Sequence, residues 1–296
     1  MIPASETCPG DVAPFALPSS VLLICVKYGA DEETERYLAS IHLQAHLSSL
    51  HVLIVENTSD GAWSPNVSRM DWRPVQAPAN LGYFGGARYG LSQYLKEQPL
   101  PQWVIVSNVD LTIPDRGFLE RLEKLNVGGD VALVAPSIRS NLTGIDQNPF
   151  MRVRPSALRM HLYKWLYRSR FVVNLHELSS AAVHKLTTFA RRRRAREQNA
   201  SRQPIYAPHG SFLIFNRAYF ERGGDLDYPE FLFGEEIYIA EKARSLNLKV
   251  VYEPSLVVVH EEHRSTKLFK SPEMARYVAA SATYCANKFF PLYQGS

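Results

Sequence analysis

Short runs of branched apolar residues alternate with helical patterns along the first half of this chain. The strand-like runs are Val21–Val26, His51–Asn57, Trp103–Asp110 and Asp130–Pro136. Apolar residues at helical spacing follow the first three runs, over Asp31–His46, Ala87–Lys96 and Phe118–Leu125. This alternation predicts an α/β fold in which a mostly parallel central sheet is flanked by helices on both faces.

The alternation resumes after a segment that is rich in Arg. Gly210–Asn216 has the strand pattern, and a helix is expected to open near Gly234. Two further strands are expected at Leu248–Pro254 and Ser255–His263, followed by a helical pattern over Glu273–Phe290. The expected parts of the chain are a loose N-terminal arm over 1–18, one α/β domain over 19–268 with a basic helical insertion at about 151–203, and a C-terminal helical extension over 269–296.

Composition excludes several classes of protein. Hydrophobic residues make up 46% and charged residues 21%, which is typical of a soluble globular protein rather than a disordered or fibrous one. The chain has neither a long apolar run nor the pattern of a signal peptide at its start, so we expect a cytoplasmic protein. Its 3 Cys are too scattered for a disulfide framework or a zinc site.

Polar side chains follow several strand runs, at the edge where parallel sheets bind ligands. The carboxylate of Glu56 is either a contact to a base or a ribose hydroxyl, or an ordinary exposed strand cap. Asn108 and Asp110 end the third run, and residues two apart on a strand share a face. Such an oxygen pair suits Mg²⁺ or Mn²⁺ held with a diphosphate, but a turn cap beside a solvated Asp explains it equally well.

Three glycines, Gly82, Gly85 and Gly86, precede the helical pattern that starts at Ala87. Glycine permits close approach of the backbone, and the N–H groups at a helix start attract anionic oxygens. The stretch has neither the Gly-Lys-Ser/Thr of a P-loop nor the glycine spacing of a dinucleotide-binding motif. On their own the glycines are weak evidence for a phosphate site.

The order of the motifs is more specific than any single motif. A strand with Glu56-Asn-x-Ser-Asp-Gly is followed by Asn80-x-Gly-x-x-Gly-Gly, by Asn108-x-Asp110, by the aromatic-Gly-Glu-Glu sequence that ends at Glu236, and by a strand that ends at His260. This series resembles the family 2 glycosyltransferases of GT-A fold, and in particular their rhamnosyltransferase-like branch. The resemblance covers the chain from about residue 21 to residue 263, outside the basic insertion.

The resemblance implies a nucleotide-sugar donor, a Mg²⁺ or Mn²⁺ cofactor and inversion at the anomeric carbon. Asn108 and Asp110 match the first and last positions of the metal-binding D-x-D motif, and Asn108 replaces the usual first acid. Asp110 is therefore the expected principal metal ligand, with His260 beside the metal or the diphosphate. The resemblance and the strand ends together give the expected donor-binding residues, which are Tyr28, Glu56, Asn80, Gly82, Gly85, Gly86, Arg88, Asn108 and Lys267.

The acidic pair matches the position of the family's general base. Glu236 aligns with the usual Asp, so it is the expected base that deprotonates the acceptor hydroxyl, while Glu235 orients groups or contacts the acceptor. The alternative is that both carboxylates only favour the positive end of a helix dipole. The implied activity is a metal-dependent inverting transfer (EC 2.4) from dTDP-rhamnose or a UDP-hexose to a glycan or lipid-linked acceptor, in cell-surface polysaccharide synthesis.

The basic insertion has a function of its own to explain. From Met151 to Arg202 there are eleven Arg and two Lys but only two Glu. Leu158, Leu162, Trp165 and Leu166 fall on one helical face, and basic amphipathic helices with Trp and Leu bind anionic membrane surfaces. A peripheral position at the inner face of the cell membrane is thus one expectation. Two helices packed on the domain, with a solvated Arg run, are the other.

Two rival functions remain at this stage. A nucleic-acid-binding protein would use the Arg-rich insertion, but the acidic strand ends would repel phosphates without a metal, so we expect no nucleic-acid partner. A catalytically inactive GT-A module that binds nucleotides or regulates a partner is suggested by the replacements at Glu56, Asn108 and Glu236. Aromatic residues in the C-terminal helical pattern are candidates for homodimer or membrane contacts.

Overall fold

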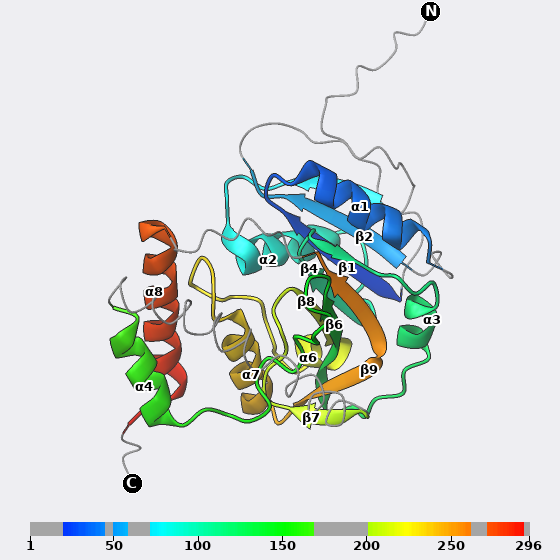
Figure 1. Cartoon of the computed structure of the whole chain (residues 1–296). Coiled ribbons are helices and arrows are strands. Elements are labelled where there is room, and N and C mark those ends of the chain that lie inside the picture. The colour runs from blue at the N-terminus through cyan, green and yellow to red at the C-terminus, as the bar shows by residue number, and fades with distance from the viewer. Residues whose placement is uncertain (1–19, 45–49, 59–71, 169–200, 262–270, 293–296) are drawn as a thin grey trace, which may run out of the picture.

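The computed structural model describes residues 20–44, 50–58, 72–168, 201–261 and 271–292. In these residues a nine-stranded sheet forms the centre of the molecule, and helices cover both of its faces (Figure 1). The predicted α/β fold is confirmed. The predicted N-terminal arm, Lys267 and most of the basic insertion lie outside the described residues.

One half of the sheet is parallel. Strands β1 (Val21–Lys27), β2 (Leu50–Glu56), β3 (Trp72–Gln76) and β4 (Trp103–Ser107) run in the spatial order β3-β2-β1-β4, and each neighbouring pair is parallel. All residues of β1, β2 and β4 are buried, as expected for parallel strands that are covered on both faces. The carboxyl ends of these strands therefore meet at one edge.

The other half of the sheet is mixed. Strand β8 (Phe212–Asn216) runs antiparallel to both β4 and β6 (Val131–Ser140), and β9 (Lys249–His260) runs parallel to β6. The short strands β5 (Leu111–Thr112) and β7 (Gln203–Ile205) pair antiparallel with β9. Because β8 is reversed, it begins at the edge where β4 ends. The loop before β8 thus reaches the same edge as the parallel strand ends.

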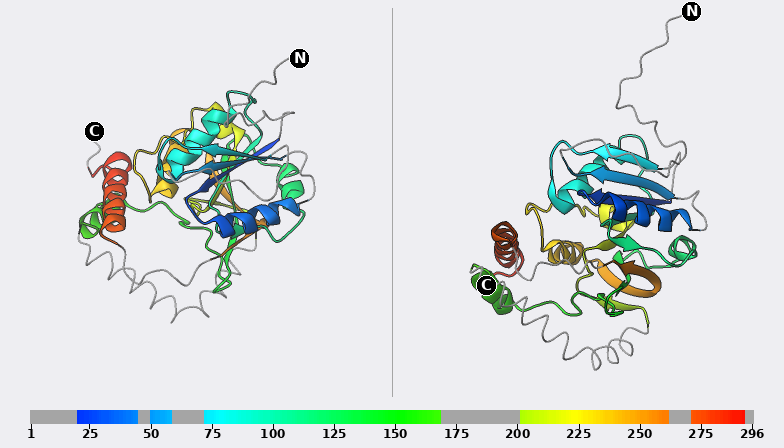
Figure 2. Two further views of the ribbon diagram at one scale, coloured as in Figure 1. Left: turned by 90° about the horizontal axis from the view of Figure 1, so that it is seen from above. Right: turned by 45° about the horizontal axis from the view of Figure 1, so that its top comes forward.

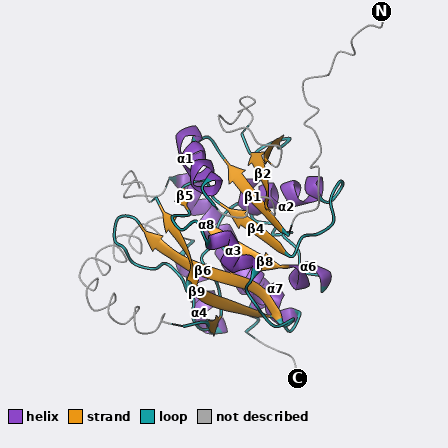
Figure 3. Ribbon diagram, turned by 90° about the vertical axis from the view of Figure 1, so that its right-hand side faces the viewer, coloured by secondary structure: helices purple, strands orange, loops and turns teal. Residues whose placement is uncertain are grey.

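The two faces of the sheet have separate hydrophobic cores. Helices α1 (Asp31–His42) and α3 (Phe118–Glu123) pack on one face, and α2 (Gly82–Tyr94), α6 (Arg217–Glu221) and α7 (Glu235–Ser245) pack on the other (Figure 3). Alternate residues of β1 enter the two cores, since successive side chains of a strand point to opposite faces. The helix that begins with glycine, α2, and the helix that begins with Glu235 and Glu236, α7, are both on the second face.

Two further helices lie side by side beyond α7, away from the sheet. They are α4 (Ala157–Leu166), from the expected insertion, and α8 (Pro272–Phe289), from the expected C-terminal extension (Figure 2). Helix α8 packs against both α7 and α4, so it joins the outer helix to the body of the molecule. None of the described helices combines the length and hydropathy that a bilayer crossing requires.

Three element boundaries differ from the sequence prediction. Helix α2 begins at Gly82 rather than Ala87, because its glycines let the first turn pack closely on β1 and on the loop before α7. Strand β4 ends at Ser107, so Asn108 and Asp110 lie beyond it, and the prediction that they share a strand face is wrong. The two strands expected at 248–263 are one strand, β9, with a register shift against β6 near Pro136.

Candidate active site

A cavity of about 580 Å³ opens at the edge where β1, β2 and β4 end and β8 begins. Residues far apart in the sequence line it, because the strand ends and the starts of α2 and α7 converge there. The lining includes seven of the residues predicted from the sequence, namely Tyr28, Asn80, Gly82, Asn108, Glu235, Glu236 and His260.

The two acids lie at the first turn of α7. Gly234 caps this helix in the left-handed conformation, with φ of 83°, and a Cβ there would meet the side chains of Ser281 and Tyr228. Glycine is therefore required for the turn that delivers Glu235 and Glu236 to the cavity. Neither acid forms an ion pair with any part of the chain that the structure describes.

Burial changes the acidity of both carboxyl groups. It raises the pKa of Glu235 to about 8, and the neighbouring charge of Glu236 adds to the increase. Burial also raises the pKa of Glu236, while a hydrogen bond from the backbone N–H of Gly210 acts in the opposite direction. Since each carboxylate disfavours ionisation of the other, the pair holds a proton more tightly than two separate acids would. Such a pair is suited to accept a proton near neutral pH.

Gly210 lies between the hydroxyl of Tyr83 and the carboxylate of Glu236 in the chain of contacts at the cavity. The hydroxyl of Tyr83 donates to the Gly210 carbonyl oxygen at 2.9 Å, and a Cβ on Gly210 would lie 2.7 Å from Glu236 Oε1. The loop before β8 thus has room for the Glu236 carboxylate only because residue 210 lacks a side chain.

Asp110 and His260 meet beside the cavity. Nε2 of His260 lies 3.2 Å from Asp110 Oδ2, and Nδ1 lies 2.8 Å from Gln147 Oε1. In the tautomer that donates its Nδ1–H to Gln147, Nε2 presents a lone pair towards Asp110. The other oxygen of this carboxylate, Oδ1, is buried and has no hydrogen-bond partner among the described residues. A cation bound between the two side chains would interact with the Nε2 lone pair of His260 and with the Asp110 carboxylate.

The ligand set for such a cation is small. No cluster of three or more His, Cys, Asp or Glu side chains that could hold a metal ion occurs in the described part of the chain. Asp110 and His260 would thus supply two ligands, and the other positions would be left to water and phosphate oxygens. This is the pattern usual for Mg²⁺ and Mn²⁺ sites that act on diphosphates.

The side chain of Asn57 fixes the turn at the start of α2. Its Nδ2 donates to Gly82 O at 2.9 Å and to Asn80 Oδ1 at 3.2 Å, and its Oδ1 accepts from Leu81 N at 2.9 Å. Gly82 has φ of 72°, and a Cβ there would overlap the Phe231 carbonyl oxygen. The turn is therefore clamped between β2 and the loop that leads to the acid pair.

Comparison with known proteins was made by sequence and by fold. No family model matches the chain. The chain is 24% identical over 276 residues to N-acetylglucosaminyl-diphospho-decaprenol L-rhamnosyltransferase of Mycobacterium tuberculosis, a match that covers 90% of this chain and 84% of that protein. It is 22% identical over 249 residues to the low-salt glycan biosynthesis hexosyltransferase Agl10 of Haloferax volcanii, covering 84% of this chain and 69% of that protein.

Two solved structures resemble the fold. The structure of GalNAc-T7 with UDP, GalNAc and Mn²⁺ gives a TM-score of 0.53 at 10% identity, over 92% of this chain and 57% of that one. The mannosyltransferase PcManGT of Pyrobaculum calidifontis, in complex with GDP-Man and Mn²⁺, gives 0.49 at 16% identity, over 94% and 73%. The chain has a GT-A fold and resembles rhamnosyltransferases. The resemblance predicted from the sequence is confirmed, and these relatives support a sugar transferase of class EC 2.4.

Four described residues among the predicted donor residues of this glycosyltransferase-like chain are not in the cavity lining, namely Glu56, Gly85, Gly86 and Arg88. Glu56 is buried, and its carboxylate is held by Lys27 Nζ at 2.5 Å and by the Thr58 hydroxyl at 2.5 Å. Arg88 lies at the surface of α2 in an ion pair with Asp227. Lys27 was missed in the sequence, although the β1–β2 register places it directly beside Glu56.

The prediction that Gly85 and Gly86 precede a helix is wrong, because both lie within α2. A Cβ on Gly86 would lie 2.9 Å from Val26 Cγ1, so this glycine serves the packing of α2 on β1.

His209, which was not predicted from the sequence, also lines the cavity. Its ring packs against His260 with the centroids 5.9 Å apart. Burial lowers the pKa of His209 to about 4, and the neighbouring His260 adds to the decrease. His209 is therefore a neutral wall of the site at pH 7. A His followed by Gly and Ser directly before a strand is the only sign of it in the sequence.

Proposed function

We propose that this protein is a metal-dependent inverting glycosyltransferase that moves a sugar from a nucleoside diphosphate to an acceptor hydroxyl. The observation that carries the proposal is the single cavity that contains the donor-turn residues Asn80 and Gly82, the acid pair and His260. A binding module would need the turn but not a pair of acids, one buried and one half-buried, without a cation. The relatives named above, which are sugar transferases, support the same reaction class.

Glu236 is the proposed base. It takes the proton of the acceptor hydroxyl while the acceptor oxygen forms a bond to the anomeric carbon. The bond from that carbon to the diphosphate oxygen breaks on the opposite face, and the nucleoside diphosphate leaves with the electron pair. Configuration inverts, and no covalent enzyme intermediate is needed. Glu235, which burial keeps protonated near neutral pH, can donate a hydrogen bond and hold the charge of its neighbour in place.

Asp110 and His260 are the proposed holders of Mg²⁺ or Mn²⁺. The buried Oδ1 of Asp110 and the short contact to His260 fit this role. When bound, the metal supplies positive charge that stabilises the departing diphosphate. Asn108, which lines the cavity, carries no charge where the D-x-D motif that the sequence resembles has its first acid, and so the proposed metal site has one negative charge fewer.

The proposed donor is dTDP-rhamnose or a UDP-hexose, and the proposed acceptor is a hydroxyl of a glycan or a lipid-linked sugar. The donor and acceptor classes follow the names of the relatives, of which one transfers rhamnose to a decaprenol-linked sugar and the other is a hexosyltransferase of glycan biosynthesis. GalNAc-T7, which shares the fold, was solved with UDP and Mn²⁺. Transfer of this kind belongs to the synthesis of cell-surface polysaccharides.

The experiment compares release of nucleoside diphosphate from a panel of nucleotide sugars by three proteins, with Mn²⁺ and a lipid-linked acceptor extract present. The wild type is expected to turn over one donor class, and Glu236→Gln is expected to lose about 10²–10⁴-fold in kcat. Glu221→Gln, on the exposed part of α6, is the matched control and should keep wild-type activity. Absence of turnover in all three proteins, with nucleotide binding retained, would instead support a catalytically inactive module.

A further inference from the structure

Helix α4 exposes an apolar stripe to solvent. The side chains of Leu158, Leu162 and Trp165 are 75%, 50% and 67% exposed. Their spacing of four and three residues places them on one face of the helix. Three large apolar side chains on one exposed face are unusual for the surface of a monomeric protein, and they mark a site that another surface covers.

The opposite face of α4 is firmly attached to the molecule. Met160 is buried, His161 Nε2 lies 2.8 Å from the carbonyl oxygen of Phe290, and Lys164 donates to Asn287 at 2.7 Å. Just before the helix, Arg154 pairs with Glu241 at 2.7 Å and stacks over the ring of Phe290 at 4.2 Å. These contacts fix the rotation of α4 about its axis, so the apolar stripe faces outward because of how the helix is anchored.

The charged side chains of α4 itself and of the turn after it are basic. Residues 157–168 include Arg159, Lys164 and Arg168 but no Asp or Glu. None of these three cations forms an ion pair with the described residues. By helical geometry Arg159 lies on a flank of the stripe, at the boundary where phosphate groups would meet a helix whose apolar side chains enter a bilayer. Arg168 lies in the turn directly after α4.

We propose that the apolar stripe of α4 and its flanking cations bind the surface of an anionic lipid bilayer. Trp and Leu enter the region between head groups and acyl chains, and the cations contact lipid phosphates. The argument for lipid over a second protein is this charge complementarity, together with a Trp in the stripe, since aromatic rings favour the membrane interface. The proposal does not depend on sugar transfer, because it concerns a surface outside the cavity.

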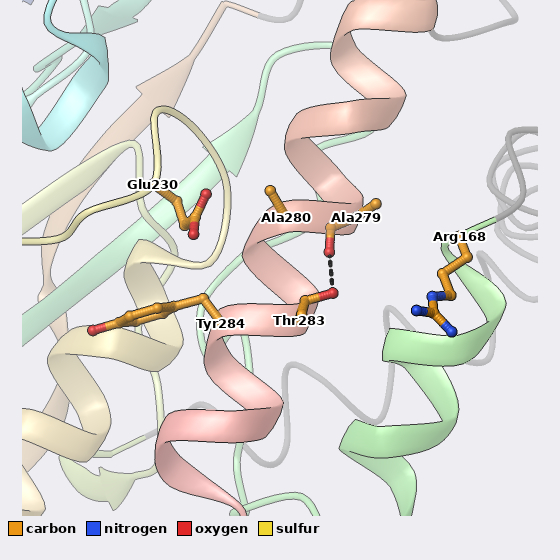
Figure 4. A pocket seen from close by; sticks show the side chains of 6 residues that line it. All are labelled: Arg168, Glu230, Ala279, Ala280, Thr283 and Tyr284. Atoms are coloured by element: carbon orange, nitrogen blue, oxygen red, sulfur yellow. Dashed lines mark hydrogen bonds between the residues drawn. The ribbon is translucent and has the colours of Figure 1, made fainter.

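The position of α4 gives the proposal a geometric consequence. A groove of about 580 Å³ lies between α4 and α8, lined by Arg168, Glu230, Ala279, Ala280, Thr283 and Tyr284 (Figure 4). Arg168 borders it from the turn directly after α4, and Glu230 borders it from the loop before α7. Helix α8 lines this groove with its middle turns and lines the cavity with its first turns, through Glu273, Met274 and Tyr277. A bilayer on α4 would therefore lie beside the helix that walls the cavity.

The test measures binding of the full chain to vesicles of phosphatidylcholine alone and of phosphatidylcholine with phosphatidylglycerol. The wild type is expected to sediment with the anionic vesicles. The triple variant Leu158→Ser, Leu162→Ser, Trp165→Ser is expected to bind them at least about tenfold more weakly. The control Leu95→Ser, Leu142→Ser removes exposed Leu side chains elsewhere and should bind as the wild type does. Equal thermal stability of the variants excludes misfolding as the cause.

A second measurement places Trp165 directly. Brominated lipids quench Trp fluorescence within the bilayer, and Trp72 and Trp103 are buried in the sheet, so in a Trp63→Phe background the quenching should come from Trp165. Equal vesicle binding by wild type and triple variant, or no quenching, would overturn the proposal. A wild-type dimer that the triple variant converts to a monomer, without vesicle binding, would also overturn it and assign the stripe to a second copy.

Discussion

Buried Glu56 and the pair of buried Glu235 and half-buried Glu236 lie at the same edge of one sheet, but their surroundings are opposite. Glu56 lies between Lys27 and the Thr58 hydroxyl, and both of its oxygens are engaged. The acid pair has no cation in the described part of the chain, and its two groups repel each other. A buried charge with a partner forms a structural ion pair, whereas a buried acid without a partner is a candidate for proton exchange.

The largest expected effect comes from removing the partner of Glu56. Lys27→Met should lower the free energy of unfolding by about 3–5 kcal/mol, because it leaves a buried carboxylate without its cation. Chemical denaturation measures this loss in the free energy of unfolding. The double variant Lys27→Met, Glu56→Gln should recover most of this loss. If the single variant loses less free energy of unfolding than the double variant, the ion pair with Lys27 does not stabilise Glu56, and Glu56 does not differ from the acid pair in this respect.

The acid pair should respond to pH in the opposite sense to a paired carboxylate. The pKa of Glu235 is raised in the folded state, so its contribution to stability is full below about pH 4.5 and is lost as pH rises towards 8, where the folded protein must release a proton that the unfolded chain has already lost. Glu235→Gln should reduce this slope to the part that comes from Glu236, and should gain roughly 4 kcal/mol over the wild type at pH 8. Parallel stability curves for the two proteins between pH 5 and 8 would contradict the unpaired state of Glu235.

Asp110 is an intermediate case, since one oxygen meets His260 and the other has no described partner. A cation should therefore complete it. Mn²⁺ together with a nucleoside diphosphate is expected to stabilise the protein by about 2.7 kcal/mol at a hundredfold excess over Kd. Asp110→Asn should abolish the metal-dependent part of the thermal shift, and EDTA should do the same for the wild type. A shift that survives in Asp110→Asn would place the metal elsewhere.

The smallest effect is a test of the space around Glu236. Gly210→Ala brings a Cβ to 2.7 Å from Glu236 Oε1, so the carboxylate must turn away. We expect about a tenfold loss in kcat, or about 1.4 kcal/mol, with little change in stability. Gly129→Ala adds a Cβ that meets nothing and serves as the control. Unchanged kcat in Gly210→Ala would argue that Glu235, not Glu236, is the base.

Much of the fold could be predicted, because buried strands and amphipathic helices have different periods along the chain. The direction of a strand has no such signal. The pattern of Phe212–Asn216 is the same whether β8 runs parallel or antiparallel, and its reversal follows only from pairing with β4 and β6. Likewise Pro254 predicts a break, but β9 continues through it with a register shift against β6.

The site could be predicted where chemistry is local in sequence. The acid pair follows a Gly, and His260 ends a strand, so both were identifiable. Lys27 was not, because its role depends on a partner 29 residues away that only the register of β1 and β2 brings near. Gly210 was not either, since what it provides is space beside Glu236, and space is a property of the fold.

The overlap that a Cβ at Gly82 would make with the Phe231 carbonyl has a mechanical consequence. At Gly82 there is room only for a hydrogen atom between the turn at the start of α2 and the loop that carries Phe231. Four residues after Phe231, α7 begins with Glu235 and Glu236. Two loops in such close contact cannot shift independently. In the proposed reaction, a movement that a sugar diphosphate imposes on the turn would be passed on to the acids, so arrival of the donor and alignment of the base would be geometrically coupled.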